Sequence, residues 1–361
     1  MFHRILRHFV REALQRAYQP RLIPSTLSND AWSAHLLEKF LELSGAQLED
    51  TVKIREDVRG IYLVRHPTFG PCVLKTIQTV YTERRATNLA MPSSLGTGTQ
   101  FRAKLIQDSP TAIFPRVLEI GPFWTLETYI EGQPFRQWMN RSFDLGPVDR
   151  FFAELKHWGH TSPIHLPNTL LTDWQIRGIC QAYLVKCLHH ARYFSLRTNL
   201  TSFRRLVSRH ASLGDRIRWL DQAAATVAIP AETMCGDMGN VNLLVAKEDD
   251  HIYNIDYEFM GPGHWGFDAA YFLSSLAKLP HSPEAIREIR KVFMRTLDDQ
   301  DQAEFFSVLT DALTEMSAAI YGGNEALPPE SRSAEDQQEN ASESASWVTS
   351  DHGISAIHRN A

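Results

Sequence analysis

Three polar side chains suited to metal binding and proton transfer stand close together within residues 233–258, the stretch TMCGDMGNVNLLVAKEDDHIYNIDYE. Mg²⁺ prefers hard oxygen ligands, and proteins usually hold it with one or two side chains together with phosphate oxygens and water. The amide oxygen of Asn242 and the carboxylate of Asp256 suit that task. Asp237, five residues before Asn242, is placed to accept a proton from an incoming hydroxyl without ligating the metal.

Two β-rich runs, LLVA and HIYNI, flank the polar turn KEDD, and this pattern predicts a β-hairpin. Cross-strand partners in an antiparallel hairpin have a constant sum of residue numbers. Asn242 and Asp256 centre on residue 249, in the middle of the turn, so we expect their side chains to emerge near the same open end. In phosphoryl transfer a protein mainly positions the reactants and neutralises charge. A base, two metal ligands and a phosphate-binding cation therefore form a sufficient set.

The order of these residues resembles the aminoglycoside phosphotransferase and choline kinase-like group of small-molecule kinases. The pattern of that family is His-Gly-Asp, four residues, Asn, a strand pair and Ile-Asp-aromatic-Glu. This chain has, in the same order, Cys235-Gly236-Asp237, Asn242 and Ile255-Asp256-Tyr257-Glu258. The resemblance spans about residues 50–320. It implies a protein-kinase-like fold and ATP and Mg²⁺ as cofactors.

The resemblance also implies phosphate-binding residues upstream. Lys75, in Val-Leu-Lys, matches the strand lysine of the family, whose ammonium contacts the α- and β-phosphates. Glu83, in the segment TERRA, matches the helix glutamate that fixes this lysine. Gly60 is the single permissive residue in the turn expected to cover the phosphates, formed by residues 57–60.

Residues 126–132, LETYIEG, look like the hinge of the family, which carries adenine on its backbone, with Glu127, Tyr129 and Ile130 as the binding residues. Three further residues are expected to support the site. They are Cys235 in place of the family histidine that packs beneath the loop, Glu258 near the metal or substrate, and Asp268 in the segment GFDAA.

For Asp268 two interpretations stay open, namely support of the catalytic loop and the capping of a helix. Trp174, His264 and Trp265 are candidates either to line an acceptor pocket or to pack in the core.

The periodicity of apolar residues predicts an α+β fold with two lobes, a small antiparallel-sheet lobe followed by a larger, mainly helical one. Its expected parts are N-terminal helices in 1–45, an ATP-binding lobe in 46–131, a catalytic and substrate-binding lobe in 132–322 and a disordered acidic tail in 323–361. Strands are expected at 52–76 in a three-stranded meander with a turn at Arg59-Gly60, and then at 101–107, 113–120 and 123–130. Helices are expected at 2–18, 30–44, 80–90, 147–160, 170–195, 200–211, 213–226, 267–279, 283–298 and 301–320.

Charge and composition exclude several classes of protein. The formal net charge is −5, and the tail alone, with seven acids and two arginines, also carries −5, so the rest is nearly neutral and has no basic face for nucleic acid. No apolar run approaches the roughly 20 residues that span a bilayer. The four cysteines are scattered, which indicates a reducing compartment. We therefore expect a cytoplasmic protein, and a monomer with its active site between the lobes is the simplest form.

Residues 2–18 form a basic amphipathic pattern, with three interpretations. The segment is a helix docked on the main body, a helix that makes weak contact with a membrane surface or an anionic partner, or a targeting presequence.

The function that the sequence predicts is an ATP- and Mg-dependent O-phosphotransferase that acts on a small-molecule hydroxyl, such as that of an aminoglycoside, an amino-alcohol or a sugar. Two alternatives stay open. One is a nucleotide-binding pseudokinase that serves as a scaffold, and the other is a kinase whose acceptor is a protein or a lipid head group.

Overall fold

The computed structural model describes residues 29–55, 59–76, 98–108, 111–121, 124–141, 143–162, 166, 168–189, 208, 210–257, 260–277 and 283–321. The helices predicted at 2–18 and 80–90, most of the one at 200–211, and the acidic tail lie outside these residues. Internal contacts divide the chain into a unit of residues 1–318 and a unit of residues 319–361. Everything below concerns the first unit, except for the last residues of one helix.

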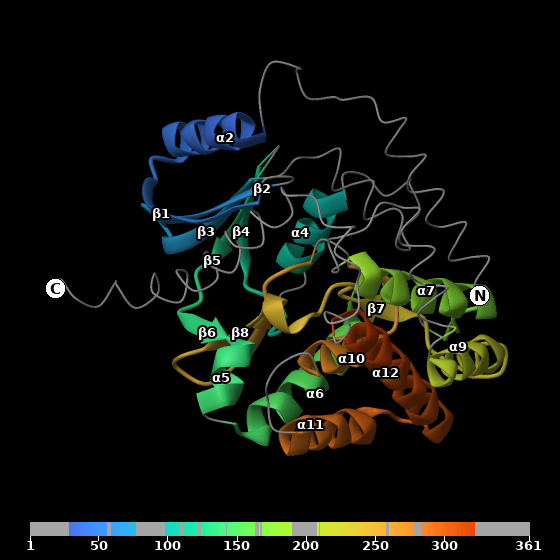
Figure 1. Ribbon diagram of the computed structural model, residues 1–361. Coiled ribbons are helices and arrows are strands. Elements are labelled where there is room, and N and C mark those ends of the chain that lie inside the picture. Colours follow the sequence, from blue (N-terminus) through green and yellow to red (C-terminus); the bar gives the residue numbers. More distant parts are fainter. Residues whose placement is uncertain are drawn as a thin grey trace, which may run out of the picture. The chain divides into compact units, whose positions relative to one another are not determined.

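An antiparallel sheet of five strands forms the first part of the fold (Figure 1). The strand order is β1-β2-β3-β5-β4, and every neighbouring pair is antiparallel. The strands are β1 (Gln47–Arg55), β2 (Arg59–His66), β3 (Gly70–Thr76), β4 (Val117–Ile120) and β5 (Trp124–Thr128). The predicted meander is therefore confirmed as β1 to β3, with Gly70 in the left-handed region (φ 73°) where the second turn ends.

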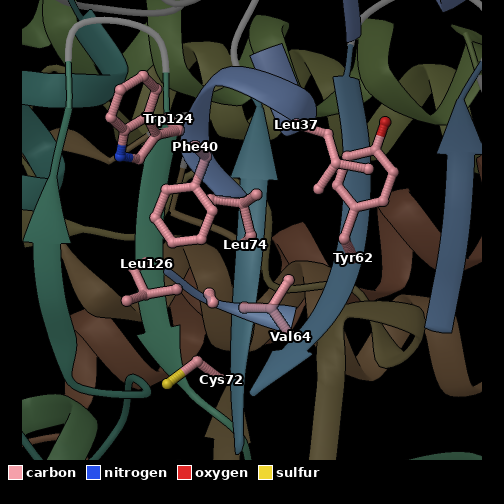
Figure 2. Packing of buried hydrophobic residues seen from close by; sticks show 9 residues of the cluster. Leu37, Phe40, Tyr62, Val64, Cys72, Leu74, Trp124 and Leu126 are labelled. Carbon is pink, nitrogen blue, oxygen red and sulfur yellow. The ribbon is translucent and has the colours of Figure 1, made fainter. Parts of the chain in front are cut away.

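One face of this sheet is apolar and packs under helix α2 (Asn29–Ser44), which supplies Leu37 and Phe40 (Figure 2). The alternation of a strand explains the other members of the cluster, because residues two apart share a face. Leu74 lies opposite both Tyr62 and Leu126 in the strand register. The remaining strand residues of this cluster are Val64, Cys72 and Trp124. The intervening positions of β3 and β5 therefore face the other way, toward the rest of the molecule.

The second part of the fold is mainly helical and holds two small sheets. One sheet has the order β6-β8-β9, with β6 (Gly132–Pro134), β8 (Leu243–Ala246) and β9 (Ile252–Asn254). The other pairs β7 (Glu232–Met234) with β10 (Gly261–Gly263). The helices described here are α5 (Phe135–Arg141), α6 (Leu145–Thr161), α7 (Asp173–His189), α9 (Ala211–Ala223), α10 (Trp265–Leu276), α11 (Pro283–Thr296) and α12 (Gln300–Tyr321).

The α+β class is confirmed, with an antiparallel sheet first and helices after it. Two local predictions are wrong, and one helix was not predicted. Residues 101–107 belong to helix α4 (Gly98–Asp108), because the positions that it buries, Arg102, Ala103 and Ile106, have helical spacing. Arg59 and Gly60 lie inside β2, where Gly60 pairs with Ile54. Helix α5 stands where no element was predicted.

None of the helices within the described part of the chain combines the length and the apolar character that a bilayer crossing needs.

A buried carboxylate lies on the strand that leads to the candidate site. Glu232 on β7 is 1% exposed, and its Oε1 lies 2.9 Å from His160 Nδ1 at the end of α6. Its Oε2 lies 3.6 Å from Nε2 of His264, the N-cap residue of α10. Burial raises the pKa of Glu232 to about 8 and lowers the pKa of His264 to about 3.

This burial predicts a pH-dependent stability. Because folding raises the pKa of Glu232, the folded state favours the protonated carboxyl group. Its contribution to the free energy of unfolding is complete below the unfolded pKa near 4.5 and is lost as pH rises through about 8. Glu232→Gln should therefore be more stable than wild type at pH 8.5 by a few kcal/mol, since each pKa unit corresponds to about 1.4 kcal/mol. Urea denaturation between pH 5 and pH 8.5 measures this difference, which should shrink toward acid pH. A difference that is independent of pH, or one that Glu288→Gln on the exposed face of α11 reproduces, contradicts the assignment.

Candidate functional site

A buried aspartate anchors the loop between β7 and the short 3-10 turn η1 (Asn240–Asn242). The two oxygens of Asp268, on α10, accept hydrogen bonds from the backbone N–H groups of Cys235 (2.5 Å) and Gly236 (2.8 Å). The hydroxyl of Tyr183, on α7, donates to the same carboxylate at 2.7 Å. Gly236 adopts a φ of 77°, which a side chain would disfavour. The loop conformation thus depends on a glycine and on one carboxylate beneath it.

Burial raises the pKa of Asp268 to about 6, and the hydrogen bonds from Tyr183 and the two backbone amides act in the opposite direction. Asp268 is the fourth residue of α10, whose N-cap is His264, so the alternative in which Asp268 only caps the helix is wrong. Cys235 is fully buried, and burial raises the pKa of its thiol well above the usual value. A thiol in that state is inert and serves packing.

Asp237 follows this anchor and is mostly buried, with a side chain 14% exposed. Its Oδ1 lies 2.6 Å from the ammonium of Lys186 on α7. The backbone carbonyl of Asp237 accepts a hydrogen bond from Asn242 Nδ2 at 2.8 Å. Because the nitrogen end of the Asn242 amide is used in this way, the oxygen end is the one that can ligate a cation.

A second amide fixes the middle of the loop. Asn240 is buried, and its backbone N–H donates to Ser275 Oγ at 2.9 Å while its Nδ2 donates to the Ser275 carbonyl at 2.8 Å. Ser275 lies on α10, the helix that also carries Asp268. One helix therefore holds the loop at two points, on either side of Asp237.

The predicted hairpin forms, but its register differs by one residue. β8 pairs with β9 through Leu243 and Asn254, and the Ile255 N–H donates to the Asn242 carbonyl at 2.9 Å. Asn242 is thus opposite Ile255, and Asp256 is the next residue. The turn Lys247–Asp250 has four residues, with Asp250 in the left-handed region (φ 54°), so its centre falls between residues 248 and 249 rather than on 249. Asp256 is 6% exposed, and its N–H donates to Asn254 Oδ1 at 3.2 Å.

Lys75 reaches this hairpin from the polar face of the five-stranded sheet. Its ammonium donates to the carbonyl of Ile255 at 2.7 Å and to Glu127 Oε2 at 2.6 Å. It also lies 5.2 Å from the centre of the Tyr257 ring. Both members of the Lys75–Glu127 pair are buried. The two strands place them on one face, because Lys75 pairs with Thr125 and Glu127 follows two positions later.

A continuous series of hydrogen bonds therefore joins the predicted site residues. It runs from Lys75 to the Ile255 carbonyl, from the Ile255 N–H to Asn242, and from the Asn242 amide to Asp237. Asp256 is adjacent to Ile255 in the chain. Lys75 is far from the other residues in the sequence, and the fold brings it to the hairpin.

The residues expected to bind the nucleotide lie in different surroundings. The side chain of Glu127 is not directed to a ligand, because it accepts hydrogen bonds from Lys75 and from the Tyr257 hydroxyl at 2.7 Å. Tyr129 is 41% exposed and Ile130 is half-buried, in the connection between β5 and β6. Gly60 lies in β2, and its N–H donates to Thr76 Oγ1 at 2.9 Å.

Two of the predicted site residues, Glu83 and Glu258, lie outside the described residues, so the pairing of Glu83 with Lys75 stays a prediction. Among the acceptor candidates, His264 and Trp265 are buried in the core, where both contact aromatic rings, whereas Trp174 is 69% exposed. The packing alternative therefore holds for the first two.

The donor set around the hairpin suits a hard cation. Asn242 supplies an amide oxygen and Asp256 a carboxylate, and Mg²⁺ takes such oxygen ligands together with phosphate and water. Across the described ranges no three His, Cys, Asp or Glu side chains converge on a common metal position. A Mg²⁺ that binds with its nucleotide needs only one or two protein ligands, so these residues fit that group.

Sequence reasoning missed Lys186 and Tyr183. Both lie on the same side of α7, three residues apart, and both touch the Cys235–Asp237 segment or its anchor. The available signal was a lysine within an otherwise apolar helical stretch, YLVKCL, which a buried carboxylate explains.

No protein-family model and no curated protein matches this sequence. Several solved structures are similar to it. Choline kinase from Cryptosporidium parvum Iowa II has 11% identity and a TM-score of 0.46, with 80% of this chain and 88% of that chain covered. Macrolide 2'-phosphotransferase from Brachybacterium faecium has 12% identity and a TM-score of 0.47, with 84% and 96% covered.

Spectinomycin phosphotransferase in complex with ADP and spectinomycin has 14% identity and a TM-score of 0.43, with 90% of this chain and 94% of that chain covered. At such identities and TM-scores the likeness decides nothing about this chain.

The anchoring role of Asp268 predicts the effect of removing its charge. In Asp268→Asn one acceptor oxygen becomes an N–H donor that faces a backbone N–H of residue 235 or 236, so we expect a loss of about 2–4 kcal/mol. Amide hydrogen exchange at these two positions should accelerate at pH 7.5. Tyr183→Phe is the matched control, because it removes one donor without creating a clash and should cost only about 1 kcal/mol. Unchanged exchange in Asp268→Asn would refute the role.

The Lys75–Glu127 pair predicts strong coupling. Glu127→Gln leaves a buried ammonium without its counter-charge and should destabilise the fold by about 3–5 kcal/mol. Adding Lys75→Met to that variant should recover much of the loss, which denaturant unfolding of the full double-mutant cycle measures. The parallel cycle with Glu83→Gln tests the partner that the sequence predicted. Larger coupling of Lys75 to Glu83 than to Glu127 would show that the sequence-based pairing is the stronger one.

Proposed function

We propose that the protein transfers the γ-phosphate of ATP, bound with Mg²⁺, to a hydroxyl group of a small molecule. One observation carries the proposal, the hydrogen-bonded series that links a strand lysine, Lys75, through the hairpin to Asn242 and Asp237. The series joins a cation, an amide and the backbone of Asp237, and Asp256 follows Ile255 in the chain. Phosphoryl transfer needs a cation, metal ligands and a base of this kind.

Asn242 and Asp256 would hold the Mg²⁺, which when bound neutralises charge on the phosphate oxygens. Lys75 binds phosphate oxygens with the ammonium that Glu127 and the Ile255 carbonyl now orient. Because both partners of Lys75 belong to different parts of the fold, the lysine fixes the distance between the sheet and the metal-binding residues. The backbone between Tyr129 and Glu131 is where adenine would bind.

Asp237 acts on the acceptor. Its carboxylate accepts the proton of the hydroxyl group while the acceptor oxygen forms a bond to the γ-phosphorus and the bond from that phosphorus to the β,γ-bridging oxygen breaks. The proton then resides on the carboxylate and leaves to solvent after the product departs. The hydrogen bond from Asn242 to the Asp237 backbone sets the distance between the base and the metal ligand.

The acceptor belongs to the class of small hydroxylated molecules that the sequence resemblance implies. A panel of aminoglycosides, choline, amino-alcohols and sugars, with Mg·ATP as donor, covers that class. Wild-type protein should consume ATP faster with at least one member of the panel than without it, as measured by ADP formation.

Asp237→Asn tests the base directly. We expect kcat to fall by about a hundredfold to ten-thousandfold, the usual contribution of a general base. Binding of a fluorescent ATP analogue should change little, because Asp237 does not hold the nucleotide. Asp215→Asn, which removes an exposed carboxylate on α9, is the matched control and should retain full activity. Equal turnover in wild type and Asp237→Asn would contradict the proposal and favour a scaffold that binds nucleotide without chemistry.

A further inference from the structure

The loop that carries the base holds no cation of its own. Its sequence from Asp237 to Asn242 is DMGNVN, so any positive charge next to the Asp237 carboxylate comes from another element. That element is α7, whose Lys186 places its ammonium 2.6 Å from Asp237 Oδ1 and 3.0 Å from the Gly236 carbonyl.

The environment of Lys186 restricts how its ammonium can move. The side chain is only 10% exposed, and the ammonium lies 5.4 Å from the centre of the Tyr271 ring on α10. The buried alkyl stem of Lys186, the face of the Tyr271 ring and the two oxygen acceptors together hold the ammonium in one position. The same contact holds the Asp237 carboxylate in place, because its charged oxygen is a stronger acceptor than the Gly236 carbonyl.

Packing alone does not require an ammonium at this position. The same side of α7 is apolar, with Ile179, Tyr183 and Cys187 all buried. A buried ion pair is often matched or exceeded in stability by apolar side chains of similar volume. Stability therefore does not require an ion pair at this position, and the presence of a lysine next to Asp237 calls for a functional explanation.

Helix α7 fixes the Cys235–Asp237 segment in two ways. Tyr183 donates to Asp268, which binds the two N–H groups of the segment, and Lys186 binds the carbonyl and the side chain that follow. Tyr183 and Lys186 are three positions apart, so both stand on one side of the helix. A carboxylate thus binds the N–H groups of the segment, and a lysine binds one of its carbonyl groups and the Asp237 side chain.

From this geometry we propose that Lys186 is a positioning residue for the reaction, an inference that rests on the proposed function. Its ammonium occupies Asp237 Oδ1 and so leaves Oδ2 as the oxygen that receives the acceptor proton. An unheld carboxylate would rotate about its χ2 angle, and displacement of a reacting group by about 1 Å can cost about a hundredfold in rate.

Lys186→Met tests the inference, because methionine keeps the length of the side chain and removes the charge. With Mg·ATP and the acceptor found in the panel, or with water as the acceptor where none is found, kcat should fall by about a hundredfold. The KM for ATP and the binding of a fluorescent ADP analogue should change by no more than about twofold. Arg177→Met on the same helix is the matched control and should leave both quantities unchanged.

A double variant separates positioning from other roles. If Lys186 acts through Asp237, adding Lys186→Met to Asp237→Asn should not slow the reaction further, because the group that it positions is already gone. Two rate losses that multiply in the double variant would overturn the inference, since Lys186 would then act on the phosphate independently.

The remaining outcomes also test the inference. Retention of wild-type kcat in Lys186→Met would refute the inference, as would a parallel loss of nucleotide binding and of cooperative unfolding, which indicates a structural role. Where Lys186→Met fails to fold, Lys186→Gln provides the same comparison. A wild-type protein without any turnover would refute the proposed function itself, whereas turnover that survives Lys186→Met would refute only the positioning role.

Discussion

The ammonium of Lys75 is shared between a carboxylate of the first sheet and a backbone carbonyl of the hairpin. Such a buried charge is stable only with good acceptors on all sides, so it constrains the spacing of the elements that supply them. Glu127 comes from the strand beside Lys75, whereas Ile255 comes from the far hairpin. The lysine thereby ties the rigid sheet to the residue before Asp256, and the position of the candidate metal ligand follows from the position of the sheet.

A second constraint acts on the other side of the site. Asp268 is buried, burial raises its pKa, and three donors converge on its two oxygens. Helix α10 carries this aspartate and also Ser275, which binds Asn240. A regular helix therefore fixes the position of the irregular loop that contains Asp237. Glu232, another buried carboxylate, lies on the strand that leads into the loop. Local polar groups inside an apolar core thus fix the geometry of the candidate site.

The sequence predicts a good part of this arrangement and misses the rest for physical reasons. Strand alternation predicts the meander, which the structure contains. The order of Asp237, Asn242 and Asp256 indicates a phosphoryl-transfer site, which stays a prediction. The hairpin register is missed by one residue, because a four-residue turn has its centre between two residues. Helix α4 is missed because one of its buried positions is Arg102, which hides the apolar period. Lys186 is missed because only the fold brings α7 beside the loop; its partner is distant in the sequence, and a single lysine in a helix usually lies in solvent.

The central claim is that Asn242 and Asp256 hold the metal of a nucleotide next to Lys75. The most direct measurement is the anomalous scattering of Mn²⁺ in crystals of the protein grown with Mn²⁺ and ADP. We predict a peak with the amide oxygen of Asn242 and a carboxylate oxygen of Asp256 at coordination distance, about 2.1 Å, and with the ADP phosphates on the side of Lys75. A metal peak elsewhere in the molecule, or nucleotide bound away from Lys75, would contradict the account.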